Sequence, residues 1–194
     1  MVNYRFVIHC SGFSDKITLV EFCAHGVKDL FRVAEKFICS HPGAKFVLAG
    51  DGALWEWCKD EINNKKLTNI SMLGWVSMNQ MDALFSGADT FVLPNHIEGF
   101  PLIINEAMSQ GLPIVSTQVG AIPDSVIDGQ NGYCVEPKNT NQLSAAIGNL
   151  ATYQKLCDEF CTQSLEILNT NHNPKVFFEK LMRLFGHQKE HIFG

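Results

Sequence analysis

The chain has 194 residues, 46% of them hydrophobic and 18% charged, which is the composition of a folded globular protein that can bury a real core. Its formal net charge of −5, without any cluster of Lys or Arg, excludes a nucleic-acid-binding surface. No apolar run is long enough to span a membrane and the N-terminus lacks a signal-peptide pattern, so we expect no transmembrane segment.

The seven cysteines are scattered along the chain and odd in number. Most lie in apolar or helical stretches, where a reduced cysteine packs as a small hydrophobic side chain. Cys157 and Cys161 are four residues apart in a predicted helix, but no pair of His or Cys is placed to complete a zinc site. We therefore expect a reduced, cytoplasmic protein without a metal site.

Predicted strands and helices alternate from the N-terminus onward. A weak strand candidate at residues 4–9 precedes a stronger one at residues 17–22, and Gly26 then leads into a helix with apolar side chains at helical spacing. There follow a strand at residues 45–49, a helix from about residue 54, a strand at 69–73, and a helix capped by Ser77 that ends near residue 85.

The alternation continues through the rest of the chain. It comprises a strand at 90–93, a helix at 102–110, strands at 113–116 and 133–135, and helices at 141–150, 153–168 and 174–185. This order implies an α/β fold, a Rossmann-like doubly wound parallel sheet flanked by helices. We predict one domain over residues 1–194, with its core at about 15–150 and C-terminal helices at about 153–186.

The stretch at residues 89–117 has the form strand, loop, helix, strand, and it offers an anion site. Pro101 has the fixed φ of a first helical position. The N–H groups near Leu102 and Ile103 then lack intrahelical partners and carry positive partial charge, which suits a phosphate or diphosphate. Gly99 allows the backbone to approach such a ligand closely.

Two carboxylates frame this predicted anion site, eight positions apart in the sequence. Glu106 could accept hydrogen bonds from ribose hydroxyls, and Glu98 could accept them from a sugar. In the alternative interpretation, Glu98 caps the helix and Glu106 is a solvated helical charge. The residue pattern alone leaves both interpretations open.

The same stretch resembles the donor-site signature of retaining glycosyltransferases of family 4 (group 1), which have the GT-B fold. That signature is two glutamates separated by seven residues, with EGFP at the first and EAM at the second. The matching residues are Glu98, Gly99, Phe100, Pro101, Glu106, Ala107 and Met108. The resemblance covers roughly residues 44–150, and it implies that the chain binds a nucleotide-sugar donor.

The resemblance also implies donor-pocket roles for residues elsewhere in the chain. Gly50 and Gly52 would lie near the pocket, although a tight strand-to-helix turn explains them equally well. Gly74 and Trp75 match the segment that faces the nucleotide base, where Trp75 could instead be a packing residue. His96 could reach a donor phosphate or sugar, or it could simply be a surface residue.

Three positions depart from the family pattern. Family members usually carry an arginine at the end of the first strand and a lysine five residues later, before a glycine, and both neutralise the departing diphosphate. Anchoring on Gly26 places Val20 at the arginine position and His25 at the lysine position. His25 could supply partial positive charge. Ala121, after Gly120, replaces the second of two glycines that border the donor sugar.

The length matches only one half of a GT-B enzyme, in which an N-terminal domain binds the acceptor and a C-terminal domain binds the donor. We therefore expect that this chain lacks the N-terminal acceptor domain, and that the acceptor half is a separate polypeptide or the chain is a fragment of a longer protein. Exposed cleft surface then predicts a partner chain or self-association.

The sequence therefore supports two hypotheses. In the first, the chain is the donor domain of a retaining glycosyltransferase that transfers a UDP- or GDP-hexose to a glycan or lipid-linked acceptor, in the cytoplasm or at the inner face of the membrane. Glu98 and His25 would act in catalysis, without a cofactor, and without a metal because no Asp-x-Asp pair is suitably placed. In the second, it is a non-catalytic nucleotide-sugar-binding or regulatory subunit, or an inactive fragment.

Overall fold

The computed structural model describes residues 17–21, 26–172, 178 and 182, and these contain one six-stranded, all-parallel sheet. The strands are β1 (Ile17–Glu21), β2 (Lys45–Ala49), β3 (Ile70–Gly74), β4 (Thr90–Leu93), β5 (Ile114–Thr117) and β6 (Gly132–Val135). The helices are α1 (Val27–Ser40), α2 (Trp55–Lys65), α3 (Met78–Phe85), α4 (Leu102–Ser109), α5 (Ile122–Ser125), α6 (Thr140–Thr152) and α7 (Gln154–Asn171).

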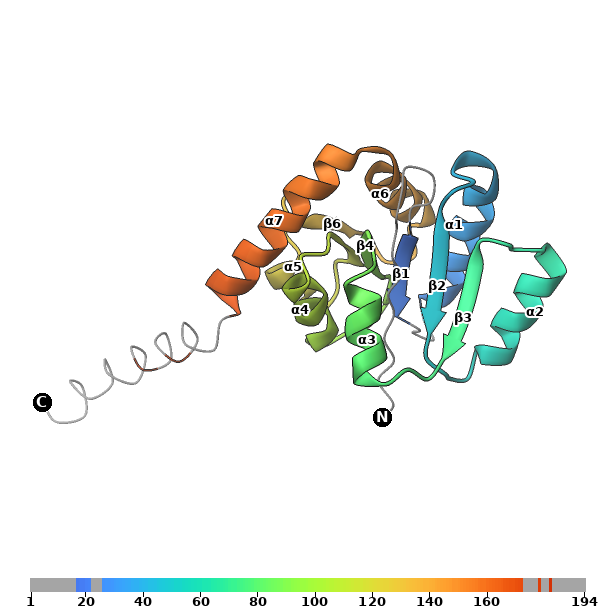
Figure 1. Ribbon diagram of the computed structural model, residues 1–194, viewed down its shortest axis with the longest axis horizontal. Coiled ribbons are helices and arrows are strands. Elements are labelled where there is room, and N and C mark those ends of the chain that lie inside the picture. Colours follow the sequence, from blue (N-terminus) through green and yellow to red (C-terminus); the bar gives the residue numbers. More distant parts are fainter. Residues whose placement is uncertain (1–16, 22–25, 173–177, 179–181, 183–194) are drawn as a thin grey trace, which may run out of the picture.

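The strand order is β3-β2-β1-β4-β5-β6, the order of a Rossmann fold. The chain runs outward from β1 in one direction and from β4 in the other. Right-handed crossovers therefore place α1 and α4 on opposite faces of the sheet. Helix α6 packs against α1 and helix α7 packs against α4, so both faces are covered (Figure 1). The predicted doubly wound α/β fold is confirmed.

The core lies between these layers and is built largely from aromatic and branched aliphatic side chains. Every residue of β4 and β5 is buried, as expected for parallel strands covered on both faces. Phe37 of α1 meets Phe46 of β2 edge-on with ring centroids 5.5 Å apart, and Phe85 of α3 meets Phe91 of β4 in the same way at 6.0 Å. These contacts fix the helices against the sheet and so set where each strand-to-helix loop emerges.

The element boundaries agree closely with the sequence predictions, with a few differences. Pro101 is the residue before α4 rather than its first helical residue, with φ −77° and ψ 102°. The short helix α5 was not predicted, because four residues are too few to show a periodicity. The predicted strand at 4–9 lies outside the described residues, as does nearly all of the predicted helix at 174–185.

Candidate functional site at the carboxyl edge of the sheet

The direction in which successive strands are added to the sheet reverses between β1 and β4, which are hydrogen-bonded neighbours. We call this place the switch point. In open α/β sheets a crevice forms outside the carboxyl ends of the strands at such a point, and ligands bind there. Val20 pairs with Leu48 on one side and with Val92 on the other, so it lies within the central strand. His25, in the segment that follows β1, lies outside the described residues.

The loop between β4 and α4 holds Glu98 in place through two hydrogen bonds. The side-chain amide of Asn95 donates to Glu98 Oε2 over 2.6 Å, and the N–H of Gly99 donates to Glu98 Oε1 over 3.0 Å. Neither donor belongs to the first turn of α4, and no described side chain caps that helix. The alternative in which Glu98 caps the helix is therefore wrong.

The loop rests on the turn that follows β5. Gly120 has a φ of +56°, and a Cβ there would overlap the carbonyl oxygens of Glu98 and Gly99. The N–H of Ala121 donates to the Gly99 carbonyl over 2.8 Å, and the Thr117 hydroxyl donates to the Asn95 carbonyl. The Gly120–Ala121 turn thus contacts the backbone of the Glu98 loop directly and helps to hold it in place.

Helix α4 presents an open N-terminus at this edge. Pro101 contributes no N–H, and the N–H groups of Leu102 and Ile103 lie in the first turn, where α-helical geometry provides no acceptor. Ile103 is buried and anchors the helix, whereas Leu102 is 64% exposed. Glu106 lies one turn further along, partly exposed. Partial positive charge of the helix terminus and two carboxylates therefore occur within one loop–helix unit.

The glycines predicted to lie near the donor pocket, Gly50 and Gly52, and the predicted base-facing Gly74 form a second part of the edge, next to β2 and β3. Gly50 has φ +119° and Gly74 has φ +70°, and the Gly50 N–H donates to the Gly74 carbonyl over 2.7 Å. Gly52 follows in an exposed turn that leads into α2. Trp75 is 66% exposed, which argues against its alternative role as a packing residue.

His96 is neither a surface residue nor an isolated one. Its Nε2–H donates to Asp29 Oδ2 over 2.6 Å, and its side chain is only 16% exposed. Asp29 lies in the first turn of α1 and is itself buried, and its other oxygen accepts a 2.7 Å hydrogen bond from Arg32. The loop after β4 is therefore tied to α1, a contact that the sequence did not suggest.

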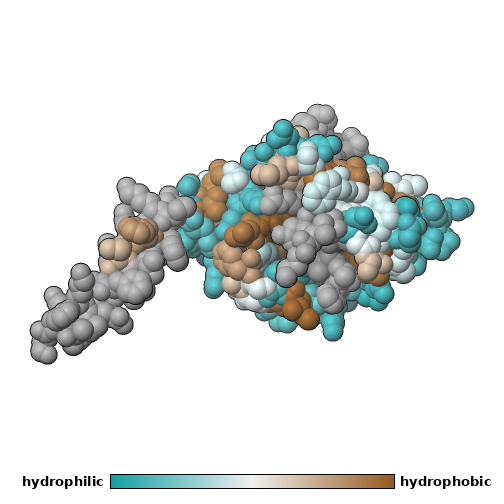
Figure 2. All heavy atoms as spheres, turned by 90° about the horizontal axis from the view of Figure 1, so that it is seen from below, coloured by the Kyte–Doolittle hydropathy of each residue, from teal (hydrophilic) through white to brown (hydrophobic). Residues whose placement is uncertain are grey.

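Apolar side chains are exposed around this edge. Figure 2, which views the molecule from the side to which the strands point in Figure 1, shows apolar atoms interspersed with polar ones. Exposed large hydrophobic residues lie at the end of β3 and on the loops and helices that follow β3 and β4: Leu73, Trp75, Met78, Ile97, Phe100 and Leu102. The Phe100 ring also lies 5.9 Å from the His172 ring, at the end of α7.

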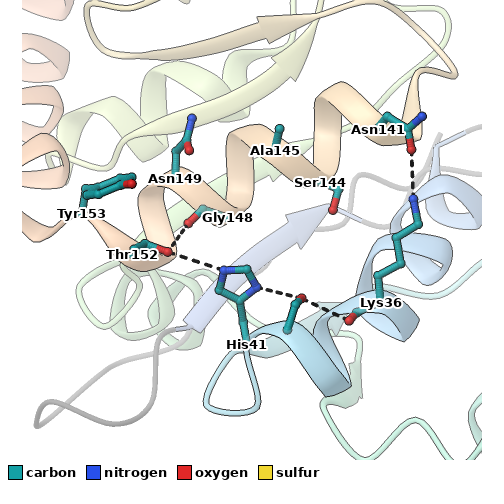
Figure 3. Close-up of a pocket in the computed structure, with 10 residues that line it drawn as sticks. Lys36, His41, Asn141, Ser144, Ala145, Gly148, Asn149, Thr152 and Tyr153 are labelled. Atoms are coloured by element: carbon teal, nitrogen blue, oxygen red, sulfur yellow. Dashed lines mark hydrogen bonds between the residues drawn. The ribbon is translucent and has the colours of Figure 1, made fainter.

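A separate cavity of about 440 Å³ lies between α1 and α6, and none of the predicted site residues lines it (Figure 3). Its polar groups bond one another: Lys36 Nζ donates to Asn141 Oδ1 over 3.0 Å, and the Ser40 hydroxyl lies 2.9 Å from His41 Nδ1. The cavity lies along the last turns of α1, a helix of 14 residues and about 21 Å whose other end is at the carboxyl edge. We interpret this cavity as part of the polar packing interface between α1 and α6 and not as a ligand site.

Two buried cysteines in the described part of the chain, Cys58 and Cys134, carry thiols that are not joined in a disulfide. Burial raises the pKa of the Cys58 thiol to about 12 and that of Cys134 to about 11. No three His, Cys, Asp or Glu side chains among the described residues gather in a group that could hold a metal ion. None of the helices within those residues is long and apolar enough to cross a bilayer.

Sequence reasoning missed Asp29, Asn95 and Thr117, which hold the loop together. Asp29 is an acidic residue in a helix's first turn, a common position that indicates helix-dipole compensation rather than a contact 67 residues away. Asn95 is 3% exposed, and its Oδ1 has no hydrogen-bond partner among the described residues. A buried, unpaired oxygen beside Glu98 is a feature that only coordinates can reveal.

The sheet order and the loop–helix unit at the switch point define a Rossmann-like α/β protein. Residues 23–164 match the family of group 1 glycosyl transferases. A glycogen synthase of Mycobacterium tuberculosis is 31% identical over 123 residues, which cover 63% of this chain and 30% of that protein. The chain therefore belongs to the group 1 glycosyltransferases, as the Glu98–Glu106 signature predicted.

Solved structures agree on the fold. The C-terminal domain of the group 1 protein LpcC from Francisella tularensis superposes with a TM-score of 0.73 at 22% identity, over 86% of this chain and 89% of that one. A mutant of S. aureus TarM, solved with UDP, superposes with a TM-score of 0.76 at 23% identity, over 91% of this chain and 37% of that one. The chain spans about a third of the length of the curated relatives it matches.

Proposed function

We propose that this chain is the donor-binding half of a retaining glycosyltransferase, which takes a hexose from a UDP- or GDP-sugar for transfer to a glycan or lipid-linked acceptor. The observation that carries the proposal is the loop–helix unit at the switch point. There, Glu98 and Glu106 flank the open N-terminus of α4 within a family whose signature they match.

Each part of the edge has a role in this proposal. The N–H groups near Leu102 and Ile103 hold the diphosphate, Glu106 holds the ribose, and Glu98 orients the donor sugar. Gly50 and Gly74, whose turns are hydrogen-bonded to each other, form a wall for the base together with Trp75. Developing negative charge on the leaving diphosphate is stabilised by the helix terminus, without a metal.

The acceptor is bound by a second domain or polypeptide, which covers the exposed apolar side chains of this edge. The match covers only about a third of the length of the curated relatives, which supports that arrangement. The proposal places the reaction in the cytoplasm, at the inner face of the membrane where the acceptor is lipid-linked.

Calorimetric titration of the purified chain with UDP, GDP and ADP, without metal and then with Mg²⁺, tests the donor site. We expect micromolar binding of one nucleotide that does not depend on Mg²⁺. Absence of binding by all three nucleotides would contradict the proposal.

A non-catalytic nucleotide-sugar-binding subunit is the second candidate, and one observation favours it. Val20 occupies the central strand at the position where relatives place a cation, so this chain has no positive side chain there. Adding a candidate acceptor domain separates the two functions, because a donor half would then turn over nucleotide-sugar and a binding subunit would bind it without turnover.

A further inference from the structure

Asp29 is a buried carboxylate next to the candidate site, and the proposed function gives it no role. Burying a carboxylate is costly unless it is paired and hydrogen-bonded, and Asp29 is 4% exposed. Its two partners come from different elements, Arg32 on α1 and His96 on the loop after β4. No role in donor binding has been assigned to it above, yet it lies one helical turn from the switch point.

The backbone of residues 94–96 is in contact with α1 on one side and with the end of β5 on the other. Gly26, at the start of α1, lies so close to Pro94 that a Cβ would overlap the Pro94 carbonyl. From the opposite side, the Thr117 hydroxyl at the end of β5 donates to the carbonyl of Asn95. The His96–Asp29 hydrogen bond closes this arrangement, so the backbone before Glu98 is fixed between α1 and β5.

Among the described residues, the side chain of Asn95 links this fixed backbone to the Glu98 carboxylate. Asn95 donates from its amide to Glu98 Oε2, and it is buried. A carboxylate whose loop is already fixed loses little entropy when a ligand binds, which strengthens the interaction. We propose that Asp29 and His96 are positioning residues that hold the Glu98 loop in its binding conformation for the sugar of the donor. This inference rests on the proposed function.

Two kinds of variant separate positioning from mere stability. Asp29→Asn removes the negative charge of the pair and weakens the acceptor, and His96→Ala removes the donor, whereas His96→Gln keeps an N–H donor at about the reach of Nε2. The matched control is Asn69→Ala, since Asn69 is buried and donates to the Ala34 carbonyl of the same helix, away from the loop. The control destabilises the fold without touching the Glu98 loop.

The first readout needs no ligand. The Ala121 N–H donates to the Gly99 carbonyl, so its hydrogen exchange reports opening of the loop. We expect Asp29→Asn and His96→Ala to speed this exchange about tenfold relative to amides of β2, with His96→Gln near wild type and no such local change in Asn69→Ala. Unchanged Ala121 exchange in Asp29→Asn and His96→Ala would overturn the proposal.

The second readout links the loop to the donor sugar. In calorimetry with UDP, UDP-glucose, GDP and GDP-mannose, the two disruptive variants should lose about tenfold in affinity for the nucleotide-sugar and keep the affinity for the nucleotide. An equal loss for both ligands, or none, would contradict positioning. If wild type binds none of these ligands, the donor function fails, while the exchange measurement still decides whether Asp29 and His96 hold the loop.

Discussion

A Cβ atom on Gly120 would overlap the main-chain carbonyl of Glu98, so the turn after β5 and the Glu98 loop touch at a point where only glycine fits. The φ of Gly120, +56°, is in the left-handed region that also favours glycine. The candidate carboxylate is therefore placed by a neighbouring turn rather than by its own helix.

Gly120→Ala should displace the Glu98 loop and abolish nucleotide-sugar binding, with a loss of about 2–3 kcal/mol in the free energy of unfolding. Gly129→Ala is the matched control, because Gly129 has φ +74° but a Cβ there would meet nothing within 4 Å. That control should cost about 1 kcal/mol from backbone strain alone and leave binding intact. Urea unfolding and calorimetry measure the two effects. Equal behaviour of the two variants would refute the contact argument.

The two glutamates should give different binding patterns. Glu106→Ala should weaken UDP binding by about 10–100-fold, as expected for loss of hydrogen bonds to a charged group. Glu98→Gln should leave UDP within about twofold and weaken only the nucleotide-sugar, because Glu98 is assigned to the sugar. Calorimetry with UDP and UDP-glucose decides this. Unchanged UDP affinity in Glu106→Ala would remove the ribose assignment.

Alkaline pH should destabilise the fold through its buried thiols. The folded-state pKa of Cys58 is raised from 9.0 to about 12, and that of Cys134 to about 11. Above pH 9 the unfolded chain loses these protons and the folded chain keeps them. The stabilisation is thus complete below pH 9 and is lost as the pH rises toward 11 and 12, by up to about 1.4 kcal/mol per pH unit for each thiol.

Urea unfolding at pH 8, 9 and 10 measures this loss. The fall in stability should be smaller in Cys58→Ala than in wild type, while Cys39→Ala, which changes an exposed thiol, should follow wild type. The prediction is wrong if all three proteins lose stability in parallel.

The capping box at the start of α3 should contribute measurably to stability. The Ser77 hydroxyl accepts from the Gln80 N–H, and the Gln80 side chain accepts from the Ser77 N–H. Ser77→Ala should lower the free energy of unfolding by about 1 kcal/mol. Ser86→Ala, at the other end of the same helix, removes only a hydroxyl that donates to the Asp82 carbonyl and should cost less. Thermal unfolding of both variants provides the comparison.

Local patterns were sufficient for the fold and for part of the site. The strands at 45–49 and 90–93 and the cap at Ser77 were predicted to the residue, because each is set by neighbours in sequence. The signature around Glu98 and Glu106 identified the family for the same reason. The alternative in which His96 is a surface residue is wrong, because its side chain is only 16% exposed. Its partner Asp29 is 67 residues away, and no periodicity in the sequence encodes that pairing.

The strand order also has a consequence for how the chain is made. Val20 of β1 pairs with Val92 of β4, 92 − 20 = 72 residues later, and every strand pairing in the sheet is parallel. During synthesis, β1, β2 and β3 leave the ribosome before β4, and β1 presents an unpaired edge until β4 has been translated. Such edges invite aggregation. The pairing of β1 with β4, which creates the ligand crevice, is thus also the pairing whose delay leaves the nascent chain open to aggregation.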